Sequence, residues 1–221
     1  MPTDPNPTSP RVLIVDDHDM FAESLRLALD VAGFRVQRAP SLDPEVVLAS
    51  GADADVVLLD LQFARDGTTS LPLVDPLRAA GATVVIVTGV DDPAQLGACL
   101  EAGACSVVSK SEPLEMLIHA AREAGAGRSV NPGATRTALL QALRLQRAEF
   151  GLRTERLARL TPAESEVLIA LCEGLNAEAI AERRVVSIRT VRSQIESILT
   201  KLDVTSQIGA VAIANRAGWG S

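Results

Sequence analysis

Residues that could perform phosphoryl chemistry follow four short apolar runs of the sequence. They are Asp16 and Asp17, Asp60, Thr88, and Ser109 with Lys110. Three carboxylates that converge on one point repel each other unless a cation neutralises them, and Mg²⁺ suits oxygen ligands of this kind. One carboxylate could then act as a nucleophile toward a phosphoryl donor, while Mg²⁺ and Lys110 offset charge on the transferred oxygens. Thr88 could donate a hydrogen bond to the same group.

Each of these residues has an ordinary explanation when it is taken alone, because aspartates are common in solvated loops. Their joint occurrence at the ends of four apolar runs favours a site. The chain has only two lysines among its 21 basic residues, which adds weight to the position of Lys110.

An alternation of β-branched runs with amphipathic stretches across residues 11–125 predicts stacked βαβ units and a parallel sheet. The predicted strands cover residues 12–15, 34–38, 56–59, 83–87 and 106–108. The predicted helices cover residues 20–32, 43–49, 71–80, 93–102 and 113–124. Sites in open parallel sheets form beyond the carboxyl ends of the strands. We therefore expect the residues above to meet at one edge of a five-stranded, doubly wound α/β sheet.

The strings VLIVDDHDMFAESL, VVLLDLQ, VVIVTG and GACSVVSK resemble the receiver domain of response regulators, over about residues 11–125. The resemblance implies a flavodoxin-like fold in which Asp60 is the phosphoacceptor. It also implies that Thr88 and Lys110 form the switch pair that senses the phosphoryl group. The implied Mg²⁺ ligands are Asp16, Asp17, Asp60 and the Gln62 carbonyl. We assign no chemistry to His18, although the order DDH is common in one subfamily.

The sequence departs from the receiver pattern at three places. The stretch LQFARDG, which begins after Asp60, lacks the usual proline and is one residue short, so we expect a loop of different shape. Val107 stands where many receivers carry an aromatic switch residue, and Ser111 rather than proline follows Lys110. Val107 has no ring to swing inward when Thr88 moves, which argues against the usual aromatic relay.

Residues 126–159 are predicted to form a helical linker. Glycines and a proline break the preceding pattern at 125–133, and a stretch rich in Arg, Leu and Ala follows. One apolar stripe is suggested by Leu139, Leu143, Phe150 and Leu157. Gln146, Gly151 and Arg153 interrupt it, which favours an exposed connecting helix over a dimerising coiled coil.

Residues 160–217 contain only helical patterns. The first helix has strong start signals, with Thr161 as N-cap, Pro162 at the first position and Glu164 at the capping-box position. A second helix is predicted at about 176–184, and a third runs from Ser187 to Leu202. This order predicts a helix-turn-helix.

The third helix has an apolar face and a polar face. The apolar positions are Val191, Ile195, Ile198 and Leu202, so this face is predicted to pack inward. The predicted DNA-binding residues are Arg189, Arg192, Ser193, Glu196 and Lys201. The arginines could bind phosphates or guanine edges. A charged helix face is usually only solvated, and the helix-turn-helix plan is what favours DNA.

The string LTPAESEVLIALCEGLNAEAIAERRVVSIRTVRSQIESILTKLDVTSQIGAVAIA resembles a LuxR-type DNA-binding domain, over about residues 160–214. The resemblance places the chain in the NarL/FixJ class and implies a fourth helix, at about 206–217, that supports dimerisation. Glu196 occupies a position that is often basic, and Glu178 replaces a frequent lysine. These departures indicate weaker phosphate binding or a different DNA sequence.

The charge is distributed unevenly along the chain. Residues 1–130 hold 19 acidic and 9 basic residues, whereas 131–221 hold 9 acidic and 12 basic residues. An acidic module that precedes a mildly basic one is consistent with nucleic-acid binding by the second. Three cysteines without CxxC spacing disfavour a disulfide framework and a structural zinc site.

No run of apolar residues approaches the ~20 that a membrane helix needs. Residues 1–10 are polar and rich in proline, so we expect a disordered tail rather than a signal peptide, and a cytoplasmic protein.

These observations predict a DNA-binding transcriptional response regulator that a sensor histidine kinase activates by phosphorylating Asp60. We expect a homodimer at least in the active form, bound to double-stranded DNA, with Mg²⁺ as cofactor and no contact with membranes. The alternative is a phosphorylation-independent regulator whose receiver serves as a dimerisation or partner-binding module. We do not expect an ordinary enzyme, since an aspartyl phosphatase would need a second acidic loop and a substrate cap.

Overall fold

The computed structural model describes residues 9–63 and 68–219, in two compact units with their boundary between Arg144 and Leu145. Most of the expected tail, residues 1–8, lies outside the described residues. Ser9 and Pro10 are held against the next strand, because their carbonyls accept hydrogen bonds from the Arg35 side chain and amide at 3.1 Å.

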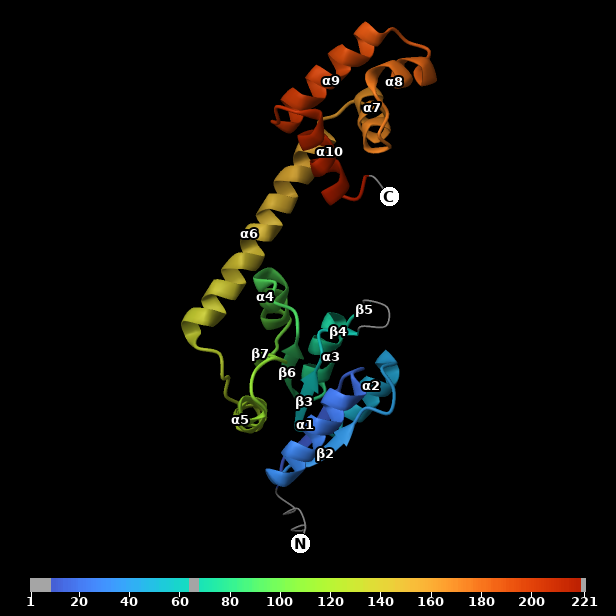
Figure 1. Cartoon of the computed structure of the whole chain (residues 1–221). Coiled ribbons are helices and arrows are strands. Elements are labelled where there is room, and N and C mark those ends of the chain that lie inside the picture. Colours follow the sequence, from blue (N-terminus) through green and yellow to red (C-terminus); the bar gives the residue numbers. More distant parts are fainter. Residues whose placement is uncertain (1–8, 64–67, 220–221) are drawn as a thin grey trace. The chain divides into compact units, whose positions relative to one another are not determined.

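The first unit contains the predicted five-stranded parallel sheet (Figure 1). Its strands are β1 (Arg11–Val15), β2 (Arg35–Arg38), β3 (Val56–Leu59), β6 (Thr83–Thr88) and β7 (Ser106–Ser109). Their order in the sheet is β2-β1-β3-β6-β7, and all neighbours are parallel. This is the doubly wound topology of the flavodoxin-like fold, so the predicted fold class is confirmed.

Helices cover both faces of this sheet. On one face lie α1 (Asp19–Val31) and α5 (Leu114–Gly125), and on the other lie α2 (Pro44–Gly51), α3 (Val74–Ala79) and α4 (Pro93–Glu101). Successive strand residues alternate between the two cores. Val12 packs with α1 and α5, for example, while Leu13 packs with α2 and α3. Burial on both faces explains why the strand sequences are continuously apolar.

The region after Asp60 differs from the prediction. Two short strands, β4 (Gln62–Phe63) and β5 (Thr68–Thr69), pair in an antiparallel hairpin, and the turn η1 (Leu71–Leu73) precedes α3. A single helix was expected over 71–80; Pro72 and Pro76 instead fall within a short 3₁₀ turn and a shorter helix. Strands of two residues have no readable period, which is why the hairpin was not predicted. Residues 64–67, the centre of the LQFARDG stretch, lie outside the described residues.

The linker forms one helix, α6 (Gly133–Ala158), that crosses the boundary between the units. The expectation of an exposed helix holds only for its middle. Phe150 is 55% exposed, but Leu143 is buried next to Gly97 of α4, and Leu157 is buried in the core of the second unit. The apolar stripe therefore serves two cores rather than one continuous interface.

The second unit is entirely helical, as predicted. After α6 it contains α7 (Pro162–Cys172), α8 (Ala177–Arg184), α9 (Ile188–Leu202) and α10 (Gln207–Arg216). Each N-cap side chain accepts a hydrogen bond from the first turn of its helix, and these caps are Thr161, Asn176, Ser187 and Ser206. The predicted capping box of Thr161 with Glu164 is present. Across the described residues, no helix has both the length and the apolar character that a membrane span requires.

Candidate functional site

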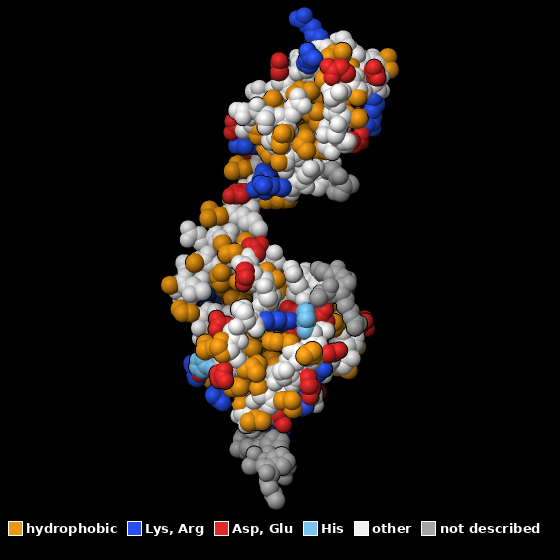
Figure 2. Space-filling model, viewed as in Figure 1, with side chains coloured by type: hydrophobic (Ala, Val, Ile, Leu, Met, Phe, Trp, Pro, Cys, Tyr) orange, Lys and Arg blue, Asp and Glu red, His pale blue; other side chains and the backbone are white. Residues whose placement is uncertain are grey.

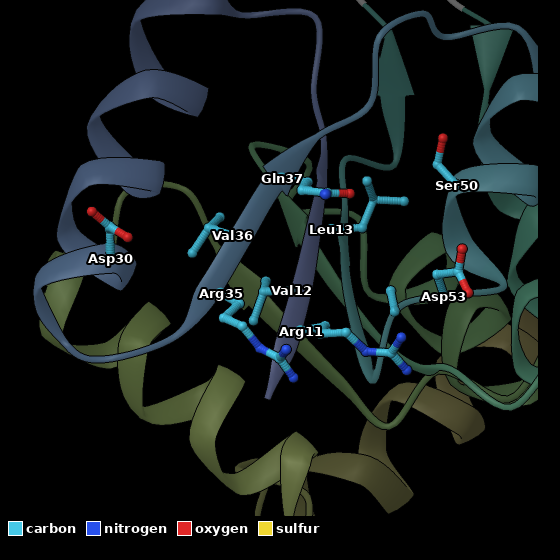
Figure 3. Close-up of a pocket in the computed structure, with 10 residues that line it drawn as sticks. Arg11, Val12, Leu13, Asp30, Arg35, Val36, Gln37, Ser50 and Asp53 are labelled. Atoms are coloured by element: carbon cyan, nitrogen blue, oxygen red, sulfur yellow. The ribbon is translucent and has the colours of Figure 1, made fainter. Parts of the chain in front are cut away.

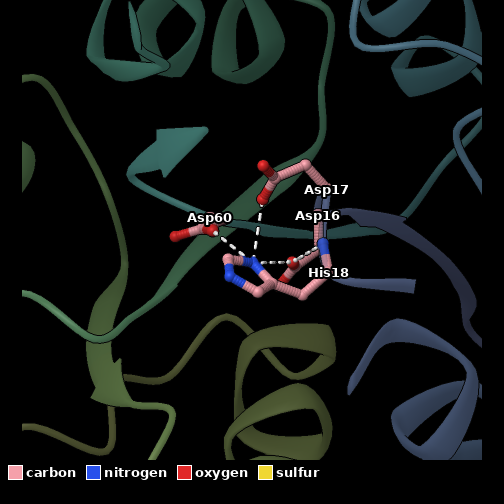
Figure 4. A group of neighbouring side chains, drawn as sticks. All are labelled: Asp16, Asp17, His18 and Asp60. Carbon is pink, nitrogen blue, oxygen red and sulfur yellow. Dashed lines mark hydrogen bonds and ion pairs between the residues drawn. The ribbon is translucent and has the colours of Figure 1, made fainter. Parts of the chain in front are cut away.

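Three aspartates meet at the carboxyl edge of the sheet, as the strand ends predicted (Figure 4). Asp16 and Asp17 follow β1, and Asp60 follows β3. Asp16 is 8% exposed and Asp60 only 3% exposed. Burial raises the pKa of Asp60 above its ordinary value, and the hydrogen bond from Lys110 offsets this only in part. A carboxylate that is buried among other carboxylates is a candidate functional group rather than a solvated loop residue.

Lys110 is the cation of this cluster. It follows β7, and its Nζ lies 2.7 Å from Asp60 Oδ2 and 2.7 Å from Asp16 Oδ2. The ammonium group also lies 5.0 Å from the centre of the Phe21 ring. One lysine thus joins two of the three carboxylates, which leaves the cluster with an excess of negative charge.

His18 also belongs to the cluster, although no chemistry was assigned to it from the sequence. Its Nδ1 lies 2.8 Å from Asp17 Oδ1 and 3.2 Å from Asp16 Oδ1, and Figure 4 shows its ring among the three aspartates. The backbone amide of His18 donates to Asp16 Oδ1 at 2.8 Å, so a local turn brings the ring back over the strand end. Its place two residues after Asp16 was the available signal.

The donor set of the cluster fits one divalent cation. One ligand atom from each of Asp16, Asp17, His18 and Asp60 lies within 4.8 Å of all the others. Carboxylate oxygens at such separations suit Mg²⁺, which takes hard oxygen ligands. Gln62, whose carbonyl was expected to complete the set, is the first residue of β4. Its backbone N–H donates a hydrogen bond to Asp60 Oδ1 at 3.3 Å.

Thr88, one of the expected switch pair with Lys110, and Val107, at the position of the usual switch aromatic, lie on neighbouring strands. Thr88 ends β6, is buried, and its hydroxyl accepts a hydrogen bond from the Val90 amide at 3.1 Å. Val107 is 7% exposed on β7 and pairs with Ile86 of β6. Both backbone groups of Val107 are bonded to the side chain of Asn131, at 2.7 and 2.9 Å. Val107 is thus a fixed point of the strand and carries no mobile ring.

A hollow of about 580 Å³ lies at the opposite, amino end of β1 and β2 (Figure 3). Its lining includes Arg11 and Arg35, two cations that could in principle attract an anion. Arg11 is paired with Asp55 at 3.3 Å, however, and the Arg35 side chain donates to the carbonyl of Ser9. Both cations of this hollow are therefore already bonded to other groups of the chain.

The polar face of α9 is exposed, as predicted. Arg189, Arg192, Ser193 and Glu196 are all exposed, whereas Val191, Ile195, Ile198 and Leu202 are buried. Arg192 is paired with Glu178 of α8 at 3.2 Å. On the face seen in Figure 2, basic side chains of the second unit alternate with acidic ones, without a continuous basic patch.

Lys201 is placed differently from the other four residues predicted to bind DNA. Its Nζ lies 2.6 Å from Glu164, a carboxylate that is only 6% exposed. Burial of Glu164 disfavours its charge, but hydrogen bonds from Lys201, Ser197 and Thr161 prevail and lower its pKa to about 2. The structure thus gives Lys201 a role in joining α9 to α7.

Comparison with known proteins gives two family matches. Residues 12–122 match the response regulator receiver domain, and residues 158–214 match the luxR family of bacterial regulatory proteins. The nitrate/nitrite response regulator protein NarP of Escherichia coli (strain K12) is 32% identical over 95% of this chain and 96% of its own length. The transcriptional regulatory protein LiaR of Bacillus subtilis (strain 168) is 29% identical over 93% and 97%.

Solved structures share the fold. The two-component response regulator RcsB, in a complex with DNA, matches 94% of this chain and 98% of its own with a TM-score of 0.50 and 24% identity. The receiver match covers half of the chain, and the relatives align over nearly all of it. The chain therefore belongs to the response regulators, with a receiver domain followed by a LuxR-type DNA-binding domain.

Proposed function

We propose that this response regulator is switched by phosphorylation of Asp60, with a sensor histidine kinase as the phosphoryl donor, and that α9 binds double-stranded DNA. The observation that carries the proposal is the position of Asp60. It lies nearly buried at the carboxyl end of β3, bonded to Lys110 and clustered with Asp16 and Asp17.

The chemistry of the transfer follows from this geometry. A carboxylate oxygen of Asp60 attacks the phosphorus of the donor, and a new oxygen–phosphorus bond forms. The nitrogen–phosphorus bond of the donor phosphohistidine breaks, and its electron pair returns to the imidazole. Lys110, which already contacts Asp60 Oδ2, neutralises charge on the transferred oxygens.

Asp16, Asp17 and Asp60 would hold Mg²⁺, because their oxygens offer the hard ligands that this ion prefers. When bound, Mg²⁺ supplies positive charge that draws together the aspartates and the anionic donor. The Gln62 carbonyl and Thr88 remain proposed contacts, to the metal and to the phosphoryl group, respectively.

The DNA-binding half of the proposal rests on α9. Arg189, Arg192, Ser193 and Glu196 form its exposed face and are the proposed contacts to phosphates and base edges. The RcsB structure cited above is described as a complex with DNA. We expect a homodimer at least in the phosphorylated form, in the cytoplasm, where its DNA lies.

One observation favours the alternative, phosphorylation-independent regulator. Val107 carries no aromatic ring, and its backbone is held at both groups by Asn131. A receiver fixed at this position could serve only as an interaction module.

Light scattering after gel filtration separates the two functions. The protein is measured with Mg²⁺ and the phosphoryl mimic beryllofluoride, alongside Asp60→Asn and the control Asp30→Asn, an exposed aspartate of α1 at the far end of the sheet. We expect a rise in mass for the wild type and the control, and none for Asp60→Asn. Failure of the intact protein to bind the mimic would establish the alternative.

A further inference from the structure

The segment before α6 runs along the exposed edge of the sheet. β7 is the last strand in the sheet order, so one side of it lacks a neighbouring strand. Asn131 bonds to both backbone groups of Val107, and Val130 donates its amide to the Ser106 hydroxyl at 3.1 Å. The hydroxyls of Ser106 and Ser129 lie 3.1 Å apart. Residues 129–131 thus occupy the place of a further strand.

The first turns of α6 then pack onto α4. Leu139 and Leu140 lie against the core on this face of the sheet, and Leu143 is 4% exposed. The contact on α4 is Gly97, a buried glycine in the middle of the helix. A methyl group at this position would clash with the carbonyl oxygen of Leu139 and come within 3.1 Å of Leu143 Cβ. The two helices therefore touch backbone to backbone.

The chain keeps a glycine here against the preference of the helix. Glycine inside a helix is less stable than alanine by about 1 kcal/mol. Docking of α6 explains why a glycine stands at position 97, because only a residue without Cβ allows the two helices to approach this closely. Gly151, inside α6, provides the contrast, since nothing lies within 4 Å of a methyl group built there.

Both docking points lie on elements next to β6, the strand that Thr88 ends: α4 follows β6 in the chain, and β7 pairs with β6. The Thr88 hydroxyl holds the Val90 amide, and Asp92 caps α4 two residues later. The Thr88 side chain is thus bonded to the segment that leads into α4. Val107, the other docking point, pairs with Ile86 on the same strand as Thr88. A backbone contact as close as that of Gly97 tolerates little displacement of α4.

We propose that residues 129–144 form a strap that is docked on β7 and α4 when Asp60 carries no phosphoryl group, and that phosphorylation loosens the strap. The docked form is the one in which Lys110 bonds directly to Asp16 and Asp60. The strap takes the place of the aromatic relay that Val107 cannot provide. The coupling to Asp60 rests on the phosphorylation proposed above, whereas the docking itself does not.

Hydrogen exchange on the full chain tests the docking without any mimic. Gly97→Ala should raise exchange of the amides of 133–144 about tenfold or more, since overpacking a close contact is strongly destabilising. Gly151→Ala, the same change in open space, should leave that region unchanged. Asn131→Ala removes the acceptor of the Val107 amide and should raise exchange at that amide. This variant tests the docking independently if Gly97→Ala does not fold. Equal exchange in all four proteins would overturn the docking.

Affinity for beryllofluoride with Mg²⁺ tests the coupling. Because coupling is reciprocal, an undocked strap should favour the mimic, and we expect about fivefold tighter binding by Gly97→Ala and Asn131→Ala than by wild type or Gly151→Ala. Equal affinities would overturn the coupling. Absence of binding by the wild type would overturn the phosphorylation itself, and with it the coupling, while the exchange comparison would still decide whether the strap docks.

Discussion

The two lysines of this chain each bond to a buried carboxylate, yet the two sites have opposite character. Lys110 lies 2.7 Å from Asp60, and Lys201 lies 2.6 Å from Glu164. The pKa of Asp60 is raised by burial, whereas that of Glu164 is lowered to about 2. The surroundings thus disfavour the charged form of the carboxylate in the receiver and favour it in the DNA-binding unit.

The difference lies in the neighbours of each carboxylate. Glu164 accepts hydrogen bonds from the backbone and hydroxyl of Thr161 and from Ser197, besides the one from Lys201. Asp60 shares Lys110 with Asp16, and the charge of Asp16 further disfavours its ionised form. Glu164 has donors on several sides, as a structural ion pair does, whereas Asp60 competes with Asp16 for one lysine, as its proposed role as phosphoacceptor would require.

The largest effect is expected at Glu164. Glu164→Ala should lower the free energy of unfolding of the second unit by about 2–4 kcal/mol, because it leaves donors on α7 and α9 without their acceptor. Trp219 is the only tryptophan and packs against the core of this unit, so its fluorescence in a denaturant titration reports the change. A loss no greater than that of the exposed control Glu182→Ala would show that Glu164 is not structural.

The pH dependence of stability should follow the same carboxylate. The pKa of Glu164 is lower in the folded state, so its ionised form stabilises the fold above its ordinary pKa of about 4.5. This contribution is lost as the pH falls from about 4.5 toward 2. Trp219 fluorescence should therefore show a flatter acid dependence for Glu164→Gln than for wild type. Parallel acid profiles would contradict the assignment.

A smaller effect should distinguish Lys201, which is bonded to Glu164, from the exposed Arg189 on the same helix. Arg189→Gln should reduce the slope of log K against log salt for double-stranded DNA by about 1, as loss of one phosphate contact does. Lys201→Gln should leave this slope unchanged, because Lys201 is engaged with Glu164. Both are measured where Trp219 fluorescence shows the second unit to be folded. A reduced slope for Lys201→Gln would return this lysine to the DNA interface.

Much of this contrast could be predicted from the sequence, and the reason lies in backbone topology. The strand ends predicted that Asp16, Asp17 and Asp60 converge, since a parallel sheet brings its carboxyl ends together. The helical period likewise predicted the buried and exposed faces of α9. Both arguments need only where the backbone goes, which regular patterns determine.

The features that sequence did not predict depend on individual side chains. Lys201 lies on the turn of α9 that faces Glu164, and no period distinguishes an ion-paired lysine from a solvated one. His18 enters the cluster through one local turn. The contacts of Gly97 and Asn131 join segments that are far apart in the sequence, and each depends on a single residue.

The smallest stability effect is expected at Asp60, and it tests the contrast most directly. Asp60→Asn keeps the shape of the side chain, removes the repulsion with Asp16, and leaves Lys110 paired with Asp16 at 2.7 Å. The free energy of unfolding of the receiver should therefore fall by less than about 1 kcal/mol, or rise, because a neutral side chain costs less to bury than a charged one. Calorimetry of the receiver transition measures this, since Trp219 lies in the other unit. A loss as large as that of Glu164→Ala would mean that the Asp60 pair is structural too, and that its crowded carboxylates do not set it apart.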